Sequence, residues 1–110
     1  MQRYTIYKIA FPNGKCYIGQ TSKHEYVRWG QHLQTCSRGV HINPRMQAIH
    51  DEYGTDDWVF EILHREPINP SDEHNARWIH LLENKFIEKN SATSINGRHD
   101  YVKAKNLSFI

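Results

Sequence analysis

The sequence predicts an α+β fold in which a small mixed or antiparallel three-stranded sheet is flanked by three helices. A hairpin pattern fills residues 4–20, capped segments with helical periodicity follow it, and residues 58–63 alternate between apolar and polar as a third strand does. The chain has 110 residues, of which 38% are hydrophobic. This length suits one domain with a modest core.

The hairpin is predicted from two short runs, rich in β-branched and aromatic residues, on either side of the turn at residues 12–14. Strand side chains alternate between the two faces of a sheet. Two sets of three residues therefore share a face: Thr5, Tyr7 and Ile9 on the first strand, and Lys15, Tyr17 and Gly19 on the second. Each strand thus offers one tyrosine to a common side. Packing within the sheet is the alternative interpretation of these tyrosines, because aromatic residues favour strands.

A first helix is predicted over residues 23–35, after a Thr-Ser pair that can cap it. Its apolar residues recur at helical spacing and form a stripe of Tyr26, Trp29, Gly30 and Leu33. Arg28 and His32 are four residues apart and therefore project from the same face. They are either two solvated basic side chains or two members of one site.

A second helix is predicted over residues 44–53, because Asn43-Pro44 supplies a cap and a first-turn proline. Three of its residues are expected to point inward: Met46, Ile49 and Tyr53. His41 lies in the loop before this helix. It is a candidate contact to a phosphate or another part of a substrate, and an ordinary loop histidine is the alternative interpretation.

The third helix is predicted over residues 71–89, where one broad arc of the helix is apolar. The arc contains Ala76, Trp78, Ile79, Leu82, Phe86 and Ile87. Glu83 falls inside it, and a carboxylate on an apolar face is costly unless a base or a metal pairs with it. Its candidate partners are Arg28, Lys15, a tyrosine hydroxyl or a divalent cation.

The net charge is only +2, but the charges are unevenly placed along the chain. Residues 1–50 carry seven Lys and Arg against one acid, which gives +6, whereas residues 51–100 carry five against eleven, which gives −6. The basic half favours a polyanion such as nucleic acid as the partner. A randomly uneven surface is the alternative explanation.

The sequence pattern disfavours a membrane-spanning protein and a protein with a signal peptide. No run approaches the ~20 apolar residues that a membrane span needs, and the N-terminus enters a strand without a signal-peptide pattern. Cys16 and Cys36 form no C-x-x-C motif, so reduced thiols and a cytoplasmic location are expected.

A zinc-binding interaction domain is an alternative, because the chain has eight histidines and two cysteines. However, these residues lack zinc-ligand spacing apart from loose pairs such as Cys36 and His41.

The triads at residues 5–7, Thr-Ile-Tyr, and 17–19, Tyr-Ile-Gly, closely resemble the pair that names the GIY-YIG nuclease family. The Arg28-x-x-x-His32 spacing and the glutamate at position 83, before an aromatic residue and an isoleucine, are also similar to motifs of that family. The resemblance covers about residues 4–99. Thr5 departs from it, because the family usually has glycine at that position.

A second departure from the family lies near the C-terminus. The family usually has a Gly-Tyr-Asn run where this chain has Gly-Arg-His at residues 97–99. The asparagine that supports the active site in the family is therefore absent from its aligned position. Asn96, His99 and Asp100 are the candidates to replace it.

The resemblance implies a metal-dependent endonuclease that hydrolyses DNA phosphodiester bonds through a single Mg²⁺ (or Mn²⁺) held by Glu83. Five residues are the expected catalytic set: Tyr7, Tyr17, Arg28, His32 and Glu83. Arg28 is expected to bind the phosphate, Tyr7 rather than Tyr17 to orient or deprotonate water, and His32 to relay the proton. Four further residues are expected to bind substrate: Lys15, Gly19, His41 and Asn96.

The predicted organisation is a nuclease domain over residues 1–100 and a tail or short edge strand over residues 101–110. A free-standing nuclease of phage or mobile-element type, acting on DNA as a monomer or homodimer, is the expected kind of protein. The alternative is a catalytically silent or structure-specific nucleic-acid-binding module on the same fold.

Overall fold

The computed structural model describes residues 3–68 and 75–96 and contains one sheet and three helices in these ranges. The elements follow in the order β1 (Arg3–Ala10), β2 (Cys16–Thr21), α1 (Glu25–Ser37), α2 (Pro44–Tyr53), β3 (Val59–Pro67) and α3 (Asn75–Lys89). Within the same ranges, no helix is both long and apolar enough to cross a membrane. The predicted tail at residues 101–110 lies outside the described residues.

The three strands form an antiparallel sheet in the order β2-β1-β3, which confirms the predicted fold class. The hairpin turn uses Gly14 at φ 83°, a left-handed conformation that glycine adopts without a steric cost. In the register of the hairpin, Tyr7 lies opposite Gly19 and Ile9 lies opposite Tyr17. The two tyrosines therefore sit diagonally across neighbouring strands, two residue pairs apart in the register.

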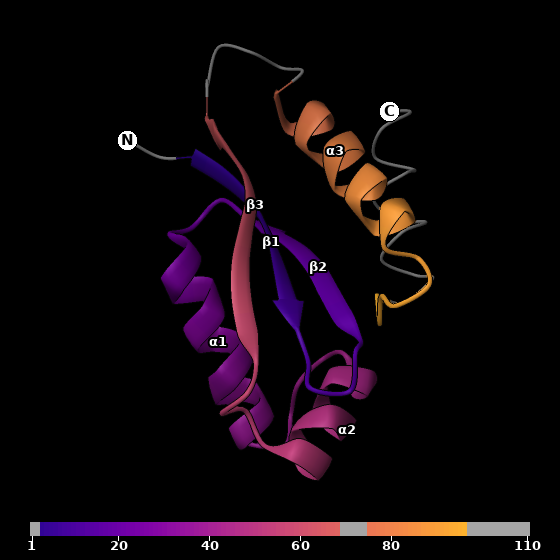
Figure 1. Cartoon of the computed structure of the whole chain (residues 1–110). Coiled ribbons are helices and arrows are strands. Elements are labelled where there is room, and N and C mark those ends of the chain that lie inside the picture. Colours follow the sequence, from indigo (N-terminus) through magenta and orange to yellow (C-terminus); the bar gives the residue numbers. More distant parts are fainter. Residues whose placement is uncertain (1–2, 69–74, 97–110) are drawn as a thin grey trace.

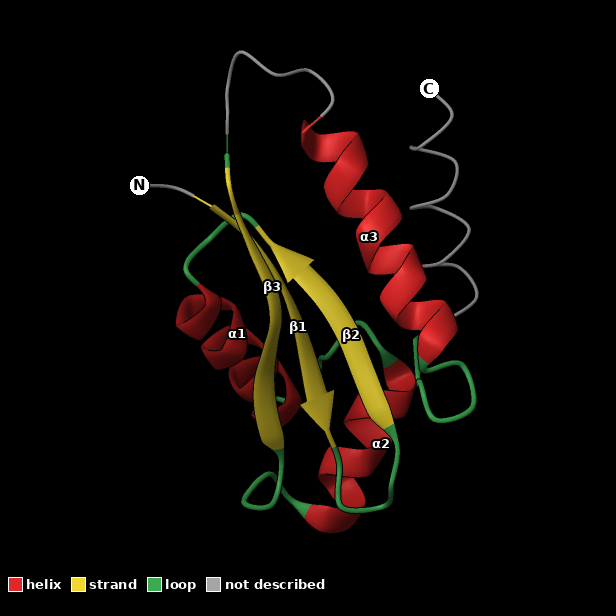
Figure 2. Ribbon diagram, turned by 45° about the horizontal axis from the view of Figure 1, so that its top comes forward, coloured by secondary structure: helices red, strands yellow, loops and turns green. Residues whose placement is uncertain are grey.

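The sheet separates two apolar clusters. α1 and α2 cover one face, where Tyr7 and Ile9 pack with Met46 and Ile49 (Figure 1). α3 covers the opposite face, where Ile6 and the other inward residues of the hairpin pack against it, as Figure 2 shows. The alternation predicted for the hairpin is thus confirmed, because Tyr7 and Ile6 lie in different clusters.

Two inward faces were predicted only in part. On α1, Trp29 and Leu33 of the expected stripe are half-buried and pack against the core, but Tyr26 is 66% exposed, and the fully buried residues are Glu25, His32 and Cys36. On α2, Met46 and Ile49 are buried as predicted, but Tyr53 is half exposed. Periodicity assigns the apolar residues to the inside, whereas α1 turns polar residues inward and pairs them there.

The helix and strand boundaries otherwise agree closely with the pattern of the sequence. α2 has the predicted bounds, and Asn43 caps it by accepting hydrogen bonds from the backbone N–H groups of Arg45 and Met46. β3 extends further than predicted, to Pro67. On α3, Ile79 and Ile87 are buried, while Trp78 is 44% exposed and donates a hydrogen bond to Glu66.

A buried carboxylate ties the start of α1 to the sheet. Glu25 is only 1% exposed and accepts hydrogen bonds from Arg65 on β3 (2.7 Å), Arg3 on β1 (2.9 Å) and the Thr5 hydroxyl (3.3 Å). Burial alone raises the pKa of Glu25, but the hydrogen bond from Arg65 and the charges of Arg3 and Arg65 together lower it to about 2. Thr5, the residue that departs from the family triad, thus supports this ion pair.

We expect Glu25→Gln to lower the free energy of unfolding at pH 7 by about 1–3 kcal/mol, because two arginines lose their carboxylate partner. This range allows for the partial exposure of both arginines, which weakens the pairing through solvent screening. Urea titration measures the difference, and Glu52→Gln, at an exposed site on α2, is the control.

The effect of Glu25→Gln should also depend on pH. A carboxyl whose pKa is lowered on folding adds stability above its unfolded pKa, near 4.5, and this stability is lost as pH falls toward 2. The difference between the wild type and the variant should therefore be largest at neutral pH and shrink below pH 4.5. A constant difference down to pH 2 would contradict the assignment.

Candidate active site

Tyr7 is the centre of the candidate site. Its ring is fully buried against Phe60 of β3, and its hydroxyl passes over Gly19 on the neighbouring strand. A Cβ atom at position 19 would overlap the Tyr7 hydroxyl and come within 2.9 Å of the Tyr17 ring. Gly19 is therefore the residue that lets the Tyr7 hydroxyl reach the edge of the sheet.

Two histidines continue inward from the Tyr7 hydroxyl. The Tyr7 Oη and His32 Nε2 atoms are 2.6 Å apart, His32 Nδ1 and His41 Nε2 are 2.8 Å apart, and the backbone N–H of Asn43 donates to His41 Nδ1 at 2.9 Å. The Tyr17 ring lies 5.5 Å from the His32 ring and closes the cluster on its other side. The structure thus brings together Tyr7, Tyr17, His32 and His41 from four different segments.

The hydrogen-bonded chain has one direction. A backbone N–H can only donate, so His41 Nδ1 accepts and the hydrogen of a neutral His41 sits on Nε2. His41 then donates to His32 Nδ1, which places the hydrogen of His32 on Nε2, where it donates to Tyr7 Oη. The proton of the Tyr7 hydroxyl is consequently available to a group outside this chain.

The electrostatics of the cluster favour neutral side chains in the free protein. Burial, with the charge of Arg28 beside it, lowers the pKa of His32 to about 3, and burial lowers the pKa of His41 as well. Burial raises the pKa of Tyr7 to about 12, although Arg28 opposes this shift. At neutral pH Tyr7 is therefore a phenol and both histidines are uncharged.

Arg28 and Glu83 both act on the Tyr7 hydroxyl from opposite sides of the sheet. The Arg28 guanidinium on α1 lowers the pKa of Tyr7, and the Glu83 carboxylate on α3 raises it. Both side chains are half-buried, and Arg28 donates a hydrogen bond to Gln31. A cation, a carboxylate and a tyrosine hydroxyl therefore share one electrostatic environment.

The donor set at this point suits a hydrated hard cation. Among the described residues, no group of three or more His, Cys, Asp and Glu side chains gathers in a way that could hold a metal ion. Zinc sites need three or four such ligands. Mg²⁺ binds through one or two carboxylates, several waters and substrate phosphate oxygens, and Glu83 beside Tyr7 fits that pattern.

Asn96 supports β2 from the return segment that follows α3. Its side-chain amide accepts from the Ile18 N–H (2.8 Å) and donates to the Ile18 carbonyl (2.6 Å), as a neighbouring strand would. Ile18 lies between Tyr17 and Gly19, so this pair of bonds fixes the second triad. Both polar groups of the Asn96 amide are engaged with the Ile18 backbone, so Asn96 supports β2 next to the two tyrosines. His99 and Asp100 lie outside the described residues.

Lys15 stands apart from the cluster. It is exposed at the end of the hairpin turn, where its backbone N–H donates to Asn13, and it is not among the groups that shift the pKa of Tyr7. Two supporting residues, Asn43, which fixes the orientation of His41, and Glu25, which anchors α1, were not predicted from the sequence to belong to the site. The capping position of Asn43 was a visible signal, whereas the partners of Glu25 lie 22 and 40 residues away from it.

Tyr7, Tyr17, Arg28 and Glu83 belong to β1, β2, α1 and α3, respectively. The family model described as the GIY-YIG catalytic domain matches residues 3–96, so the chain belongs to the GIY-YIG family. Compared by sequence with curated proteins, the chain has no significant match.

Two solved structures share this fold. A mutant catalytic domain of the intron endonuclease I-TevI aligns with a TM-score of 0.70 at 23% identity, over 86% of this chain and 92% of that one. The catalytic domain of the homing endonuclease I-TevI aligns with a TM-score of 0.65 at 22% identity, over 86% and 99%. These similarities confirm the predicted fold.

We expect Gly19→Ala to displace the Tyr7 ring, because the added methyl group overlaps the hydroxyl. Overpacking of this kind costs about 1–3 kcal/mol of stability, and the cleavage rate should fall with it. Gly30→Ala is the matched control, since nothing lies within 4 Å of a Cβ atom at that helical position. Thermal unfolding should show Gly30→Ala to be stabilised by up to about 1 kcal/mol. Equal stabilities for the two variants would contradict the packing of Tyr7 on Gly19.

Proposed function

We propose that this domain hydrolyses DNA phosphodiester bonds with the help of one divalent cation, Mg²⁺ or Mn²⁺, bound at Glu83. The observation that carries the proposal is that the Arg28 guanidinium and the Glu83 carboxylate both act on the Tyr7 hydroxyl, the first lowering its pKa and the second raising it. A phosphate needs a cationic partner, its attacking water needs an oriented oxygen or nitrogen, and a hard cation needs a carboxylate. The site has one residue for each requirement.

Arg28 is the residue proposed to bind the phosphate that is cleaved. Its planar guanidinium can donate two parallel hydrogen bonds to two phosphate oxygens, which fixes the phosphate as well as attracting it. The hydrogen bond that Arg28 donates to Gln31 restricts the conformations of the Arg28 side chain before substrate binds. Charge that develops on the phosphate in the transition state is stabilised by this arginine.

Tyr7 is the residue proposed to orient the attacking water and, once its own hydroxyl proton has passed to solvent, to accept the proton of that water as a phenolate. With a pKa of about 12 in the free protein, it does so only after substrate and cation have changed its surroundings. The His32 Nε2–H bond to Tyr7 Oη stabilises the phenolate, because a donor to the charged form favours that form. His32 therefore acts through Tyr7 as a hydrogen-bond donor, which replaces the proton relay predicted from the sequence.

His41 and Tyr17 are assigned supporting roles. His41 is joined to His32 and to the Asn43 backbone, so it orients His32 instead of contacting substrate as predicted. Tyr17 packs its ring against those of Tyr7 and His32. When bound at Glu83, the cation would supply charge to the phosphate and the leaving oxygen.

The silent binding module is the weaker of the two functions. Its main support in the sequence was the missing asparagine of the return segment. Asn96 takes up the supporting position next to the second triad, because it bonds to the backbone of Ile18. We also propose that the protein is a free-standing nuclease of phage or mobile-element type, that it acts as a monomer or homodimer, and that it is located in the cytoplasm.

Glu83→Ala tests the proposed function most directly. We expect the wild type to nick or linearise supercoiled plasmid with Mg²⁺ and not with EDTA, and Glu83→Ala to cut nothing while still shifting DNA in a gel. Glu88→Ala, on the same helix and exposed, is the control and should cut normally. Cleavage by Glu83→Ala at the wild-type rate would contradict the proposal that Glu83 binds the cation.

Arg28→Ala should lower the rate of cleavage by about a thousandfold or more, since arginines that neutralise a transferring phosphoryl group contribute on this scale. Arg28→Lys should recover only part of the rate, because lysine keeps the charge and loses the planar fork. Arg38→Ala serves as the control, at the exposed end of the same helix. Single-turnover kinetics measure the effect, and a loss below tenfold would place Arg28 outside the phosphate site.

A further inference from the structure

A polar pocket adjoins the candidate active site. It has a volume of about 380 Å³ and opens between the end of β2, the start of α1 and the side chain of Tyr4. Six of its lining residues matter here: Tyr4, Gln20, Ser22, Lys23, Arg28 and Gln31. Only Arg28 belongs to the catalytic set. The volume lies at the small end of the range for pockets that hold small ligands.

The chemistry of the lining favours an anion. Lys23 and Arg28 contribute two positive charges, the other lining side chains are uncharged, and none of the lining residues is acidic. Hydroxyl and amide groups beside the two cations add hydrogen-bond donors. A phosphate is the common anion that combines charge with several acceptor oxygens.

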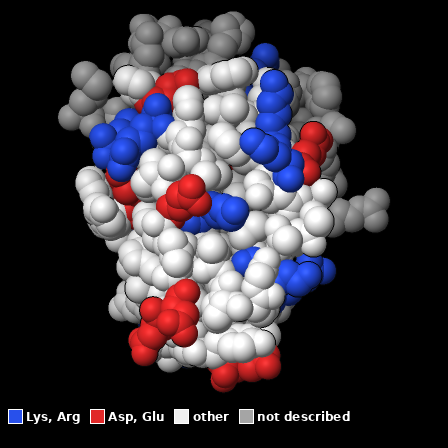
Figure 3. Space-filling model, viewed as in Figure 1, with Lys and Arg blue, Asp and Glu red and all other residues white. Residues whose placement is uncertain are grey.

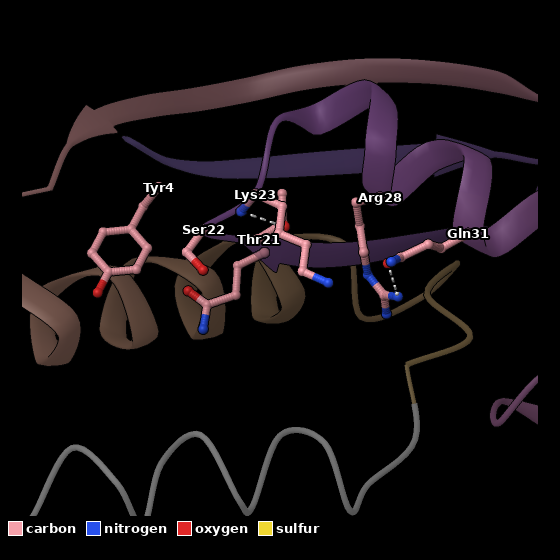
Figure 4. A pocket seen from close by; sticks show the side chains of 7 residues that line it. Tyr4, Thr21, Ser22, Lys23, Arg28 and Gln31 are labelled. Carbon is pink, nitrogen blue, oxygen red and sulfur yellow. Dashed lines mark hydrogen bonds between the residues drawn. The ribbon is translucent and has the colours of Figure 1, made fainter. Parts of the chain in front are cut away.

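The cationic wall is held in place by local hydrogen bonds. The backbone N–H of Lys23 donates to the Thr21 hydroxyl (3.0 Å), which fixes the turn between β2 and α1. Arg28 donates to Gln31 (3.3 Å) one turn further along the helix. Figure 4 shows the Lys23 and Arg28 side chains projecting to the same side, with Tyr4 beyond Lys23. The order of chemical groups along the pocket is therefore guanidinium, ammonium and aromatic ring.

Two features connect this pocket to a nucleic-acid strand. Arg28 is shared with the site that binds the cleaved phosphate in the proposed function, so the pocket continues that site. At the other end lies Tyr4, which is half-buried and packs against the cluster of Ile6 and Ile18. Tyrosine rings stack on nucleobases, and cationic side chains contact the phosphates between them.

We propose that this pocket binds the nucleotide next to the cleaved phosphate, with its phosphate at Lys23 and its base against the Tyr4 ring. This inference rests on the proposed function for the identity of the neighbouring site. It gives the domain a substrate contact on one side of the cut, and thus a defined orientation of the cleaved strand. On the face in Figure 3, Lys and Arg lie in separate groups among acidic residues and form no continuous basic surface.

Binding tests the pocket without cleavage. Fluorescence anisotropy with a labelled duplex, in the Glu83→Ala background, compares Lys23→Ala with Lys85→Ala, an exposed lysine on α3. We expect Lys23→Ala to weaken binding about tenfold and to reduce the salt dependence by roughly one phosphate contact. Lys85→Ala should change neither quantity. Equal effects of the two substitutions would overturn the proposal, whether or not the wild type cuts DNA.

A methylphosphonate scan locates the contact. Replacing one phosphate at a time by its neutral analogue should reveal a position, next to the cut, where the wild type loses about tenfold in affinity. Lys23→Ala should lose nothing more at that position, because the contact is already absent. If Lys23→Ala remains as sensitive there as Lys85→Ala, the phosphate is bound elsewhere and the proposal is wrong.

Tyr4→Leu examines the aromatic end of the pocket, since leucine keeps the apolar packing and removes the ring. A duplex with an abasic site at the neighbouring nucleotide should bind the wild type more weakly than the intact duplex does. Tyr4→Leu should bind the two duplexes equally well. Tyr53→Leu, at a half-exposed tyrosine on α2, is the control. If the wild type does not cut plasmid but all of these binding results hold, the proposed nuclease function is wrong and the proposed nucleotide-binding pocket stands.

Discussion

The hydrogen bond between Tyr7 Oη and His32 Nε2 is the constraint on which the site depends. At 2.6 Å, with both residues buried, it links β1 to α1. Its direction is set at a distance, because Asn43 caps α2 with its side chain and donates its backbone N–H to His41. The start of one helix thus determines which atom of another helix carries a proton. Gly19 supplies the remaining requirement, which is space for the hydroxyl.

The same domain buries an unusual amount of polar chemistry for its size. The inner face of α1 carries Glu25, His32 and Cys36 where an ordinary amphipathic helix would have aliphatic residues. Each buried polar group costs free energy unless it is paired. Glu25 is paired with arginines from both neighbouring strands, and His32 with Tyr7 and His41. The fully buried aliphatic residues are supplied by β1, β2, α2, α3 and the segment after α3, in two clusters on either side of the sheet, and Trp29 and Leu33 of α1 pack against one of them.

This division explains which parts could be predicted from the sequence. The hairpin, α2 and the buried half of α3 follow from local rules of alternation, capping and periodicity, and each was predicted with nearly its observed bounds. The inner face of α1 could not follow from periodicity, because that rule places apolar residues inside. The role of His41 needed the position of His32 nine residues earlier, and that of Asn96 needed the position of Ile18, 78 residues earlier. Local patterns carry no information about such pairs.

Glu83 has two opposing effects within the proposed function. As a bare carboxylate it raises the pKa of Tyr7, and together with burial it keeps that residue a neutral phenol in the free protein. Compensation of its charge removes this effect, while Arg28 and the His32 Nε2–H group continue to favour the phenolate. The carboxylate that is proposed to hold the cation therefore adds to the effect of burial, which is the largest cause of the raised pKa of Tyr7. Because burial remains when the charge of Glu83 is compensated, the cation would lower this pKa only in part, and the Arg28 charge and the hydrogen bond from His32 are needed beside it to favour the phenolate.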